Sequence, residues 1–465
     1  MRGNFSRVTF ERANHYSSVL TGQGEVLLDA PVNEQHAIAR HYLRTLAADL
    51  IGPYGGPAGN DPFQITALPD ANVPDLAINA GRYYVDGLMC EAELPSDGTI
   101  AATFYGQPDR VLDPERASDR LPDPPLLVYL RVWERYLTSI EAAAIREVAL
   151  GSEGPDAGTR SKLVWQVFAT DGQNPDADAP PLGDSNKGDV VSSWHAWEQE
   201  QAARARPLLR ARVERTQAND LDPCITDPAA SFRGEENQLY RVEIHTGGPA
   251  ADATFKWSRD NGSVTFAIES VAGADVVVRS LGRDSRLGLE VGNWVEVVDD
   301  AVALTGLPGP LRRVTQIDAL ERRVTLDTAP TDGIGNDTAL HPLLRRWDYS
   351  KATAVRDGTD LGPDNAIKVV EAPVGATRWL NLEDGVQIEF REEGGDYTPG
   401  DFWLIPARTQ TGDVEWPQQD GRPARRPPAG IEYRYAPLAL VHQFDNEAGS
   451  IDDLRSEFPA QAVAL

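Results

Sequence analysis

The spacing of apolar residues near the N-terminus predicts an extended arm followed by one helix. Residues 1–30 alternate between apolar and polar side chains, as an extended segment does. Over residues 34–51 apolar positions recur every three or four residues, which predicts a helix capped by Asn33 that packs through one buried stripe. The stripe consists of Ile38, Tyr42, Leu43, Leu46, Ala47 and Leu50. Residues 52–60 are rich in glycine and proline and are expected to form a loop.

Further along the chain, short runs of β-branched and aromatic residues between turn residues predict strands. The expected strands are 81–87, 125–133, 161–168, 239–244, 254–258, 294–298, 385–390 and 401–405, with a hairpin over 314–326. A second helical stretch is expected to open at Ser193 and to run to about Gln217, with a kink or break at Pro207. The fold class is therefore mainly β with minor α, built from antiparallel sheets of barrel or sandwich type.

These patterns divide the chain into four expected segments. They are an N-terminal arm and helix (1–60), a small antiparallel β domain (61–170), a polar linker with a helical stretch (171–220) and a β-rich barrel or sandwich region (221–465). The sequence contains no apolar run of about 18 residues, so no membrane-spanning helix is predicted. The first residues lack the apolar core of a secretion signal, so a cytoplasmic protein is expected.

The net charge of the chain indicates which classes of binding partner are not expected. Its formal net charge is −27, from 44 basic and 71 acidic residues. Because binding to phosphate groups needs clustered Lys and Arg, nucleic acid and anionic membranes are not expected as partners. Only five of the basic residues are Lys, a bias that fits either a GC-rich genome or a salt-rich cytoplasm. Cys90 and Cys224 have no CxxC spacing and are expected to be buried free thiols.

No motif predicts a catalytic residue, a cofactor or a metal ion, so an enzyme is not expected. The glycine-rich residues 52–59 are not followed by the Lys-Ser/Thr pair of a phosphate-binding loop. His36 and His41 are five residues apart and would lie on different faces of a helix, unlike a zinc-binding pair. The acidic residues 171–189 lack the spacing of a calcium-binding loop and indicate a solvated loop, with adventitious calcium as a minor alternative.

Seven of the ten tryptophans lie in or beside expected strands. They are Trp133, Trp165, Trp257, Trp294, Trp379, Trp403 and Trp416. Packing between strands is the favoured interpretation of these rings. A sugar-binding platform formed by one or two of them is the alternative.

Several sequence blocks, in a fixed order, extend over nearly the whole chain. They are residues 2–10 (RGNFSRVTF), 41–53 (HYLRTLAADLIGP), 81–87 (GRYYVDG), 255–264 (FKWSRDNGSV), 294–300 (WVEVVDD) and 402–408 (FWLIPAR). In these blocks the chain resembles a family of uncharacterised proteins encoded among phage-tail-like and contractile-injection-system genes. Arg2 and Asn4 stand where that family usually has Lys and Asp, and Pro31-Val32 stands where it has Asp-Trp.

The resemblance implies a structural component of a phage-tail-like contractile injection particle, at the baseplate or at a fibre attachment. Such a component is oligomeric within the assembly and docks onto other subunits, and the particle forms in the cytoplasm and can leave the cell. The candidate partner-docking residues are those of the arm: Arg2, Phe5, Arg7, Phe10 and Tyr16. Two alternatives remain open, a spike-like protein that binds or hydrolyses surface polysaccharide and a cargo or effector protein.

Overall fold

The computed structural model describes residues 2–68, 73–95, 100–112, 119–147, 149, 158–172, 180–182, 186–214, 231–331, 333–391 and 395–459. In this part of the chain the fold is mainly β with minor α, and antiparallel pairing predominates, as the sequence predicts. The helices are α1 (Asp29–Ile51), α2 (Lys187–Ala203), α3 (Asp300–Thr305) and α4 (Lys351–Arg356), with short 3-10 turns η1 (Arg12–Asn14), η3 (Ala143–Ile145) and η5 (Thr338–Leu340). None of the helices described is long and apolar enough to span a membrane.

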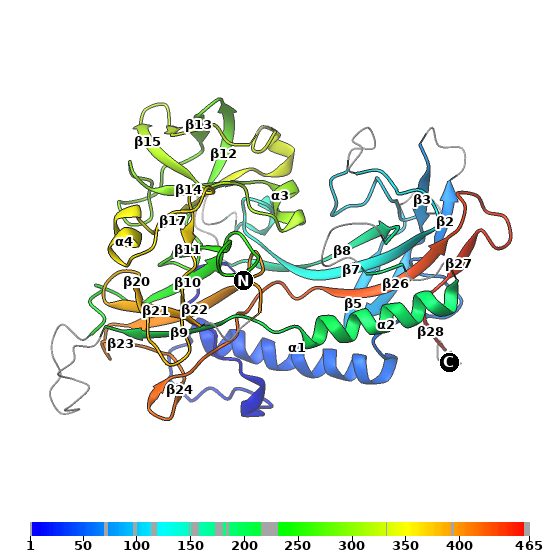
Figure 1. The fold of residues 1–465 in the computed structure, drawn as a ribbon, viewed down its shortest axis with the longest axis horizontal. Helices are drawn as coiled ribbons and strands as arrows, with labels where there is room; N and C mark the ends of the chain where they lie inside the picture. The colour runs from blue at the N-terminus through cyan, green and yellow to red at the C-terminus, as the bar shows by residue number, and fades with distance from the viewer. Residues whose placement is uncertain are drawn as a thin grey trace.

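The first β body combines strands from both ends of the chain (Figure 1, right). One sheet has the order β28-β1-β4-β5, a second β2-β3-β6 and a third β27-β26-β7-β8. The strands are β1 (Tyr54–Pro57), β2 (Ile65–Leu68), β3 (Asp75–Ile78), β4 (Gly81–Val85), β5 (Leu88–Ala92), β6 (Ala102–Thr103), β7 (Leu126–Leu137), β8 (Arg160–Thr170), β26 (Arg434–Val441), β27 (Ile451–Asp453) and β28 (Glu457–Phe458). Strands β26 to β28 therefore complete sheets whose other members lie more than 260 residues earlier.

The second β body contains two sheets packed around the largest buried core (Figure 1, lower left). One sheet has the order β18-β11-β10-β22-β23, and the other has β19-β21-β20 with β9 paired to β21. The strands are β9 (Leu208–Val213), β10 (Gln238–Ile244), β11 (Thr254–Ser258), β18 (Ile367–Lys368), β19 (Glu371–Ala372), β20 (Leu380–Asn381), β21 (Val386–Arg391), β22 (Phe402–Arg408) and β23 (Asp413–Val414). A separate hairpin pairs β24 (Gln418–Gln419) with β25 (Arg422–Pro423).

A closed barrel is inserted between β11 and β18 of the second body (Figure 1, upper left). Its strands follow the order β12-β13-β16-β15-β14-β17 around the barrel. They are β12 (Thr265–Ala272), β13 (Asp275–Val278), β14 (Trp294–Val298), β15 (Arg312–Asp318), β16 (Arg323–Leu326) and β17 (Leu343–Trp347). Closure pairs every strand on both sides, so the barrel has no exposed edge and holds its own apolar core.

The strands expected from the sequence are present with small shifts of their ends. The runs 125–133 and 161–168 become the paired long strands β7 and β8, and the hairpin over 314–326 becomes β15 and β16. Of the seven tryptophans assigned to strand packing, six are buried and Trp379 is half-buried against Arg212, whose guanidinium lies 4.0 Å from its ring. A packing role is thus confirmed for the six buried rings. Cys90 is buried and free, and Cys224 lies outside the described residues.

The start of α1 differs from the prediction. The helix begins at Asp29 rather than after Asn33, and Leu28 at its N-cap makes no side-chain hydrogen bond. Pro31 occupies the first turn, where a missing backbone N–H is not needed, and the Asp29 carboxylate accepts hydrogen bonds from Ser6. The prediction was wrong because it required a capping side chain. Here the acidic Asp29 and Pro31 in the first turn favour the start of the helix instead.

Two other expected elements were also wrong. Residues 54–57, expected as loop, form β1, which pairs with β4 and β28. The helical stretch expected from Ser193 begins at Lys187, capped by Asn186, and ends at Ala203. Residues 208–213 then form β9, because pairing with β21 buries their alternate apolar side chains. Leu, Arg and Ala favour helices by local propensity, and this tertiary pairing overrides that preference.

Candidate docking surface and arginine-lined cleft

The two arginines of the N-terminal arm form ion pairs with the body of the chain. Arg2 Nη2 lies 2.5 Å from Glu243 Oε1, and Glu243 is almost fully buried. Arg7 Nη1 lies 3.0 Å from Glu415 Oε2 at a more exposed site. The start of the arm is therefore held by β10 and by the segment after β23 in this single chain.

The aromatic residues of the arm are divided between the body and the solvent. Phe5 is half-buried, and Phe10 packs in a tilted arrangement against His41 of α1 with ring centroids 5.7 Å apart. Tyr16 is 57% exposed. As partner-docking residues the five positions of the arm remain a prediction, and of the three rings Tyr16 alone is largely open to a second chain.

The apolar stripe of α1 faces outward, contrary to the prediction that it packs on the body. Ile38 is buried, whereas Tyr42, Leu43, Leu46 and Leu50 are 53%, 68%, 56% and 77% exposed. Polar contacts also attach the helix, among them Arg44 Nη2 at 2.8 Å from Glu134 Oε1 of β7. The periodic pattern correctly predicted a helix, but the face that contacts the body is a different one.

Exposed apolar side chains are concentrated at the N-terminus. Of the 20 large hydrophobic side chains exposed in the described part of the chain, 10 fall within the first 50 residues, about a tenth of the sequence. Those that lie on α1 or in the segment that leads into it are Leu20, Val26, Leu27, Leu28, Tyr42, Leu43, Leu46 and Leu50. We call these eight residues the N-terminal apolar surface. Contiguous apolar patches on a folded protein mark sites of protein association, and within this set Leu43, Leu46 and Leu50 are neighbours at helical spacing on α1.

A buried network of ion pairs joins the second body to the barrel. Glu243 of β10 lies 2.5 Å from Arg241 Nε and 3.5 Å from Lys256 Nζ of β11. Lys256 Nζ also lies 2.9 Å from Glu296 Oε2 of β14, which accepts a hydrogen bond from the Trp347 indole. The network thus gives each buried carboxylate at least one cationic partner, as burial of charge requires.

Four of the sequence blocks meet at this network. The block 2–10 supplies Arg2, 255–264 supplies Lys256, 294–300 supplies Glu296, and 402–408 supplies Phe402, whose ring lies 3.6 Å from the Arg241 guanidinium. The arm is held by the same blocks. Asn261 Nδ2 donates to the Gly3 carbonyl oxygen at 2.9 Å, and Arg408 Nη2 donates to the Ser6 carbonyl oxygen at 2.8 Å.

The cationic partners set the protonation of the buried carboxyls. Burial by itself raises the pKa of Glu243, but Arg2, Arg241 and Lys256 hold that pKa well below its ordinary value. Burial likewise opposes ionisation of Glu296, and the Lys256 ammonium lowers its pKa to about 2. Both carboxyls therefore stay ionised at neutral pH.

Sequence reasoning missed this network, although one signal was present. Lys256 is one of five lysines among 44 basic residues and lies in the middle of the otherwise apolar or β-favouring run 254–258. A charged side chain within such a run indicates a buried ion pair. Its partners lie 13 and 40 residues away, and only the pairing of strands brings them together.

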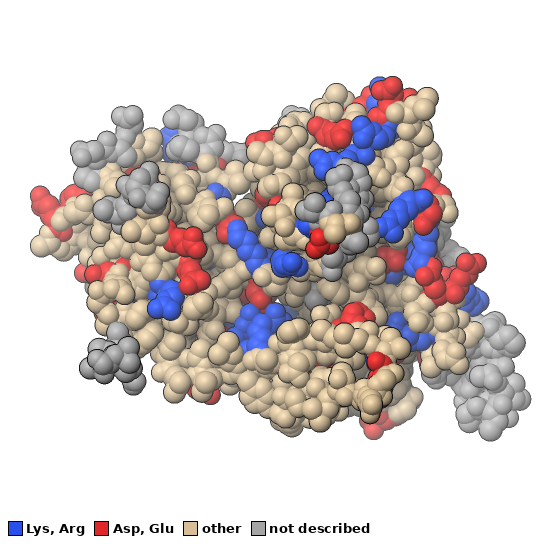
Figure 2. All heavy atoms as spheres, turned by 180° about the vertical axis from the view of Figure 1, so that it is seen from behind, with Lys and Arg blue, Asp and Glu red and all other residues tan. Residues whose placement is uncertain are grey.

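A large open cleft lies where the two β bodies and the barrel meet, with a volume of about 2260 Å³. Among the described residues that line it are 14 arginines and 11 carboxylate side chains, whereas the whole chain has 44 basic and 71 acidic residues. We call it the central cleft. Figure 2 shows basic side chains gathered near the middle of one face, around a hollow in the surface. The cleft is therefore locally positive within a strongly negative chain.

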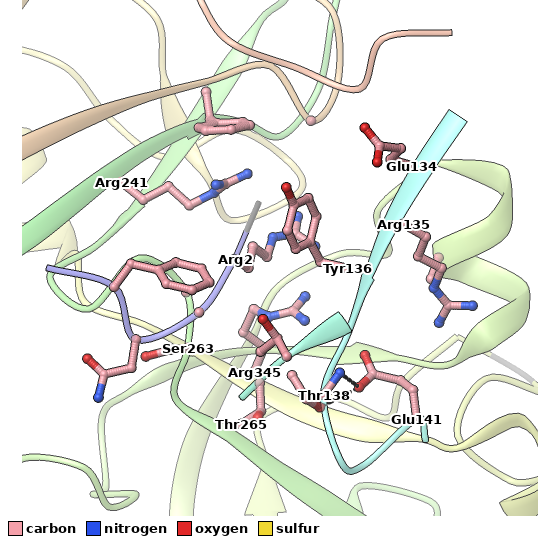
Figure 3. Close-up of a pocket in the computed structure, with 18 of the residues that line it drawn as sticks. Arg2, Glu134, Arg135, Tyr136, Thr138, Glu141, Arg241, Ser263, Thr265 and Arg345 are labelled. Atoms are coloured by element: carbon pink, nitrogen blue, oxygen red, sulfur yellow. Dashed lines mark hydrogen bonds between the residues drawn. The ribbon is translucent and has the colours of Figure 1, made fainter. Parts of the chain in front are cut away.

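Arg345 of β17 lies at the floor of the central cleft and is 6% exposed. Within the described residues, no hydrogen-bond partner lies within reach of its Nε or its Nη1. Burial and the nearby Arg2 lower the pKa of Arg345 to about 10, so it keeps its charge at neutral pH. Figure 3 shows Arg345 together with Arg2, Arg241 and the segment that carries Thr138 and Glu141.

No group of three or more His, Cys, Asp or Glu side chains in the described residues is arranged to hold a metal ion. Two carboxyls near the network are perturbed by burial. Burial and the neighbouring Asp348 raise the pKa of Asp260 to about 6, and burial also raises the pKa of Glu383 to about 7. Arg259 contacts Glu383 with a 2.7 Å ion pair, so this carboxyl belongs to a packed charge cluster.

The model of a Family of unknown function (DUF6519) matches the chain over residues 1–186 and 190–449. The chain belongs to this family. The match extends across both β bodies and the barrel, and it includes every sequence block that meets at the ion network. The resemblance to an uncharacterised family is thus confirmed. Searches of curated proteins and of solved structures found no match to this member of the family.

Proposed function

We propose that this chain is a structural component of a phage-tail-like contractile injection particle and acts by docking onto other subunits, at the baseplate or at a fibre attachment. The observation that carries the docking part is the N-terminal apolar surface. A particle subunit with that surface would be oligomeric within its assembly. The particle itself is proposed from the resemblance of the sequence blocks.

Burial of the N-terminal apolar surface by a partner is favourable because it removes hydrocarbon from water. Burial of exposed apolar area stabilises an association by about 25 cal/mol per Å². The exposed residues Leu43, Leu46 and Leu50 follow one another at helical spacing, so a partner groove or helix can contact them from one side. The closed barrel and paired sheets provide a rigid support for such a contact.

The alternative of a polysaccharide-binding or glycan-hydrolysing spike draws less support from the geometry. A sugar platform needs flat aromatic faces that are open to solvent. Six of the seven tryptophans in the strand regions are buried, and the ring of Trp379 is covered in part by Arg212. A glycan array and a reducing-sugar assay on the purified protein test that class directly.

The docking proposal is tested with Leu43→Glu/Leu46→Glu. Both side chains are exposed, so the double variant should fold with a free energy of unfolding within about 1 kcal/mol of the wild type. We expect it to be lost from particles purified from the source organism, as measured by mass spectrometry.

The matched control is Val291→Glu/Leu320→Glu, which adds the same charges at exposed apolar positions in the barrel region. It should be retained in the particles. Absence of the wild-type chain from purified particles would refute the proposed function, and retention of the Leu43→Glu/Leu46→Glu variant would refute the role of the surface.

A further inference from the structure

The central cleft contains more buried positive charge than its own carboxylates balance. At or beneath its floor lie four cations, Arg241, Lys256 and Arg345, which are buried, and Arg2, whose side chain is 34% exposed; the network carboxylates are Glu243 and Glu296. A buried cation without a counter-ion is costly, because water no longer solvates it. The arrangement therefore leaves a position for a negative group.

The nearest further carboxylate does not occupy that position. Glu141 accepts hydrogen bonds from the backbone N–H of Thr138 at 2.9 Å and from the Thr138 hydroxyl, which fixes its orientation. Glu141 attracts Arg345, but no ion pair or hydrogen bond joins the two among the described residues. Even if Glu141 is counted, the four cations exceed the carboxylates by one charge.

The geometry of the Arg345 guanidinium indicates which kind of negative group can bind at this position. Its Nε and Nη1 are the atoms without acceptors, and either of them together with Nη2 offers two parallel N–H groups that match the two oxygens of a carboxylate. The hydroxyl-bearing residues Ser263 and Thr265 line the same part of the cleft (Figure 3). Thr265 lies beside Arg345 in the β12–β17 pairing.

The depth and the lining of the central cleft favour a polypeptide as the carrier of that carboxylate. Because Arg345 is 6% exposed, the group must reach it on a narrow, flexible stem such as a Glu or Asp side chain. Apolar residues such as Phe5, Leu307 and Ile431 line the cleft together with its arginines, which suits a segment that alternates acidic and apolar residues. The one tryptophan in the lining, Trp133, is 3% exposed and offers no open face for a sugar.

We propose that the central cleft binds an acidic polypeptide segment of a partner subunit, one carboxylate of which forms a bidentate ion pair with Arg345. This inference rests on the proposed docking function and names the chemistry of the partner. The remaining arginines of the cleft rim attract the segment through their charge and orient its approach. The bound carboxylate supplies the counter-ion that the floor of the cleft lacks.

The test measures the affinity of a fluorescein-labelled peptide of alternating Glu and Leu for the full chain by fluorescence anisotropy. We expect saturable binding, no binding of the matched Gln-Leu peptide, and affinity at least about tenfold weaker for Arg345→Met. The control Arg313→Met removes an exposed arginine of the same barrel, outside the cleft, and should bind as the wild type does.

A second measurement keeps the inference testable if Arg345→Met perturbs the cleft. Because methionine replaces an uncompensated buried cation, the variant should have a melting temperature equal to or above that of the wild type without peptide. Addition of the Glu-Leu peptide should raise the melting temperature of the wild type and not that of the variant. A melting temperature well below the wild-type value in Arg345→Met would show that Arg345 is already balanced and would overturn the inference.

Three further outcomes would contradict peptide binding at Arg345. Wild-type affinity in Arg345→Met, absence of peptide binding, or tighter binding of oligogalacturonate than of the Glu-Leu peptide would each overturn the inference. The proposed function fails separately, through absence of the chain from purified particles, whatever the peptide result. The Leu43→Glu/Leu46→Glu variant should bind the peptide as the wild type does, because its substitutions lie outside the cleft.

Discussion

Glu296 links two parts of the molecule through one side chain. It lies on β14 of the barrel and forms ion contacts with Lys256 of β11, and it also accepts the Trp347 indole N–H. All three side chains are buried. A single charged group thus contacts both the barrel and the second body.

Glu296 should make stability depend on pH in the acid range. Its pKa is about 2 in the folded chain and near 4.5 when unfolded, so its stabilising contribution is complete above about pH 4.5. That contribution is lost as the pH falls from about 4.5 towards 2, because the unfolded chain then binds the proton more readily. We expect Glu296→Gln to lower the free energy of unfolding at pH 7 by about 3 kcal/mol and to flatten the acid slope.

Urea unfolding at pH 7 and at a series of acid pH values, followed by tryptophan fluorescence, measures this effect. The control Glu269→Gln replaces an exposed carboxylate of β12 in the same barrel and should change the free energy of unfolding by less than about 1 kcal/mol. An equal effect of the two substitutions would contradict the role assigned to the buried network.

At the scale of elements, α1 is attached to the body by a close approach of two backbones. The turn between β4 and β5 consists of Asp86 and Gly87, both with positive φ, as two-residue hairpin loops require. A Cβ at Gly87 would overlap the carbonyl oxygen of Arg44 in α1. Glycine is therefore needed there for two reasons, the left-handed backbone and the contact with the helix.

Gly87→Ala should displace α1 from the first body. The hairpin between β24 and β25 provides a matched control, because Gly421 has φ +72° against +75° at Gly87 and nothing lies near its Cβ position. Both alanines meet the same backbone strain of about 1 kcal/mol, but only Gly87→Ala adds the steric overlap. We expect a loss of stability larger by about 2 kcal/mol or more at Gly87.

Hydrogen exchange of residues 29–51 measures the effect on the helix. Faster exchange throughout α1 in Gly87→Ala, with unchanged exchange in Gly421→Ala, is the expected result. If the two variants exchange alike, the contact between the turn and the helix does not hold α1.

At the scale of the whole molecule, the first β body is formed from both ends of the chain. Strand β7 lies between β8 and β26, and β26 brings Leu438, Ala439 and Val441 into the core of that body. Strand β28 pairs in parallel with β1, with Gly56 opposite Glu457. The second body and the barrel are therefore an insertion between parts of one folding unit.

A fragment of residues 1–214 should not form the first body by itself. It lacks β26, so one long edge of β7 and part of the apolar core would be open to water. We expect the fragment to aggregate or to lack near-ultraviolet circular dichroism. Co-expression with a fragment of residues 231–459 should restore a soluble complex, as measured by size exclusion. Independent folding of residues 1–214 would contradict this account.

Local features of the sequence determined much of the secondary structure. The β-favouring runs at 125–133, 161–168 and 254–258 became strands, because their side-chain pattern is a property of the segment alone. The same holds for the body of α1 and for membership of the family. Local preference failed for β9, whose Leu, Arg and Ala favour a helix until β21 supplies a partner.

Only the tertiary structure decided which surfaces are covered and which charges meet. The pattern of residues 34–51 specified an apolar stripe on a helix. Whether the chain itself covers that stripe depends on distant segments, and in the folded molecule most of the stripe is left exposed. In the same way, Arg2 and Glu243 are 241 residues apart and form an ion pair only after the sheets assemble. The spacing of residues in the sequence reflects local backbone geometry, whereas burial and charge pairing arise from contacts between segments far apart in the chain. The exposed helix face and the central cleft could therefore be identified only in the folded molecule.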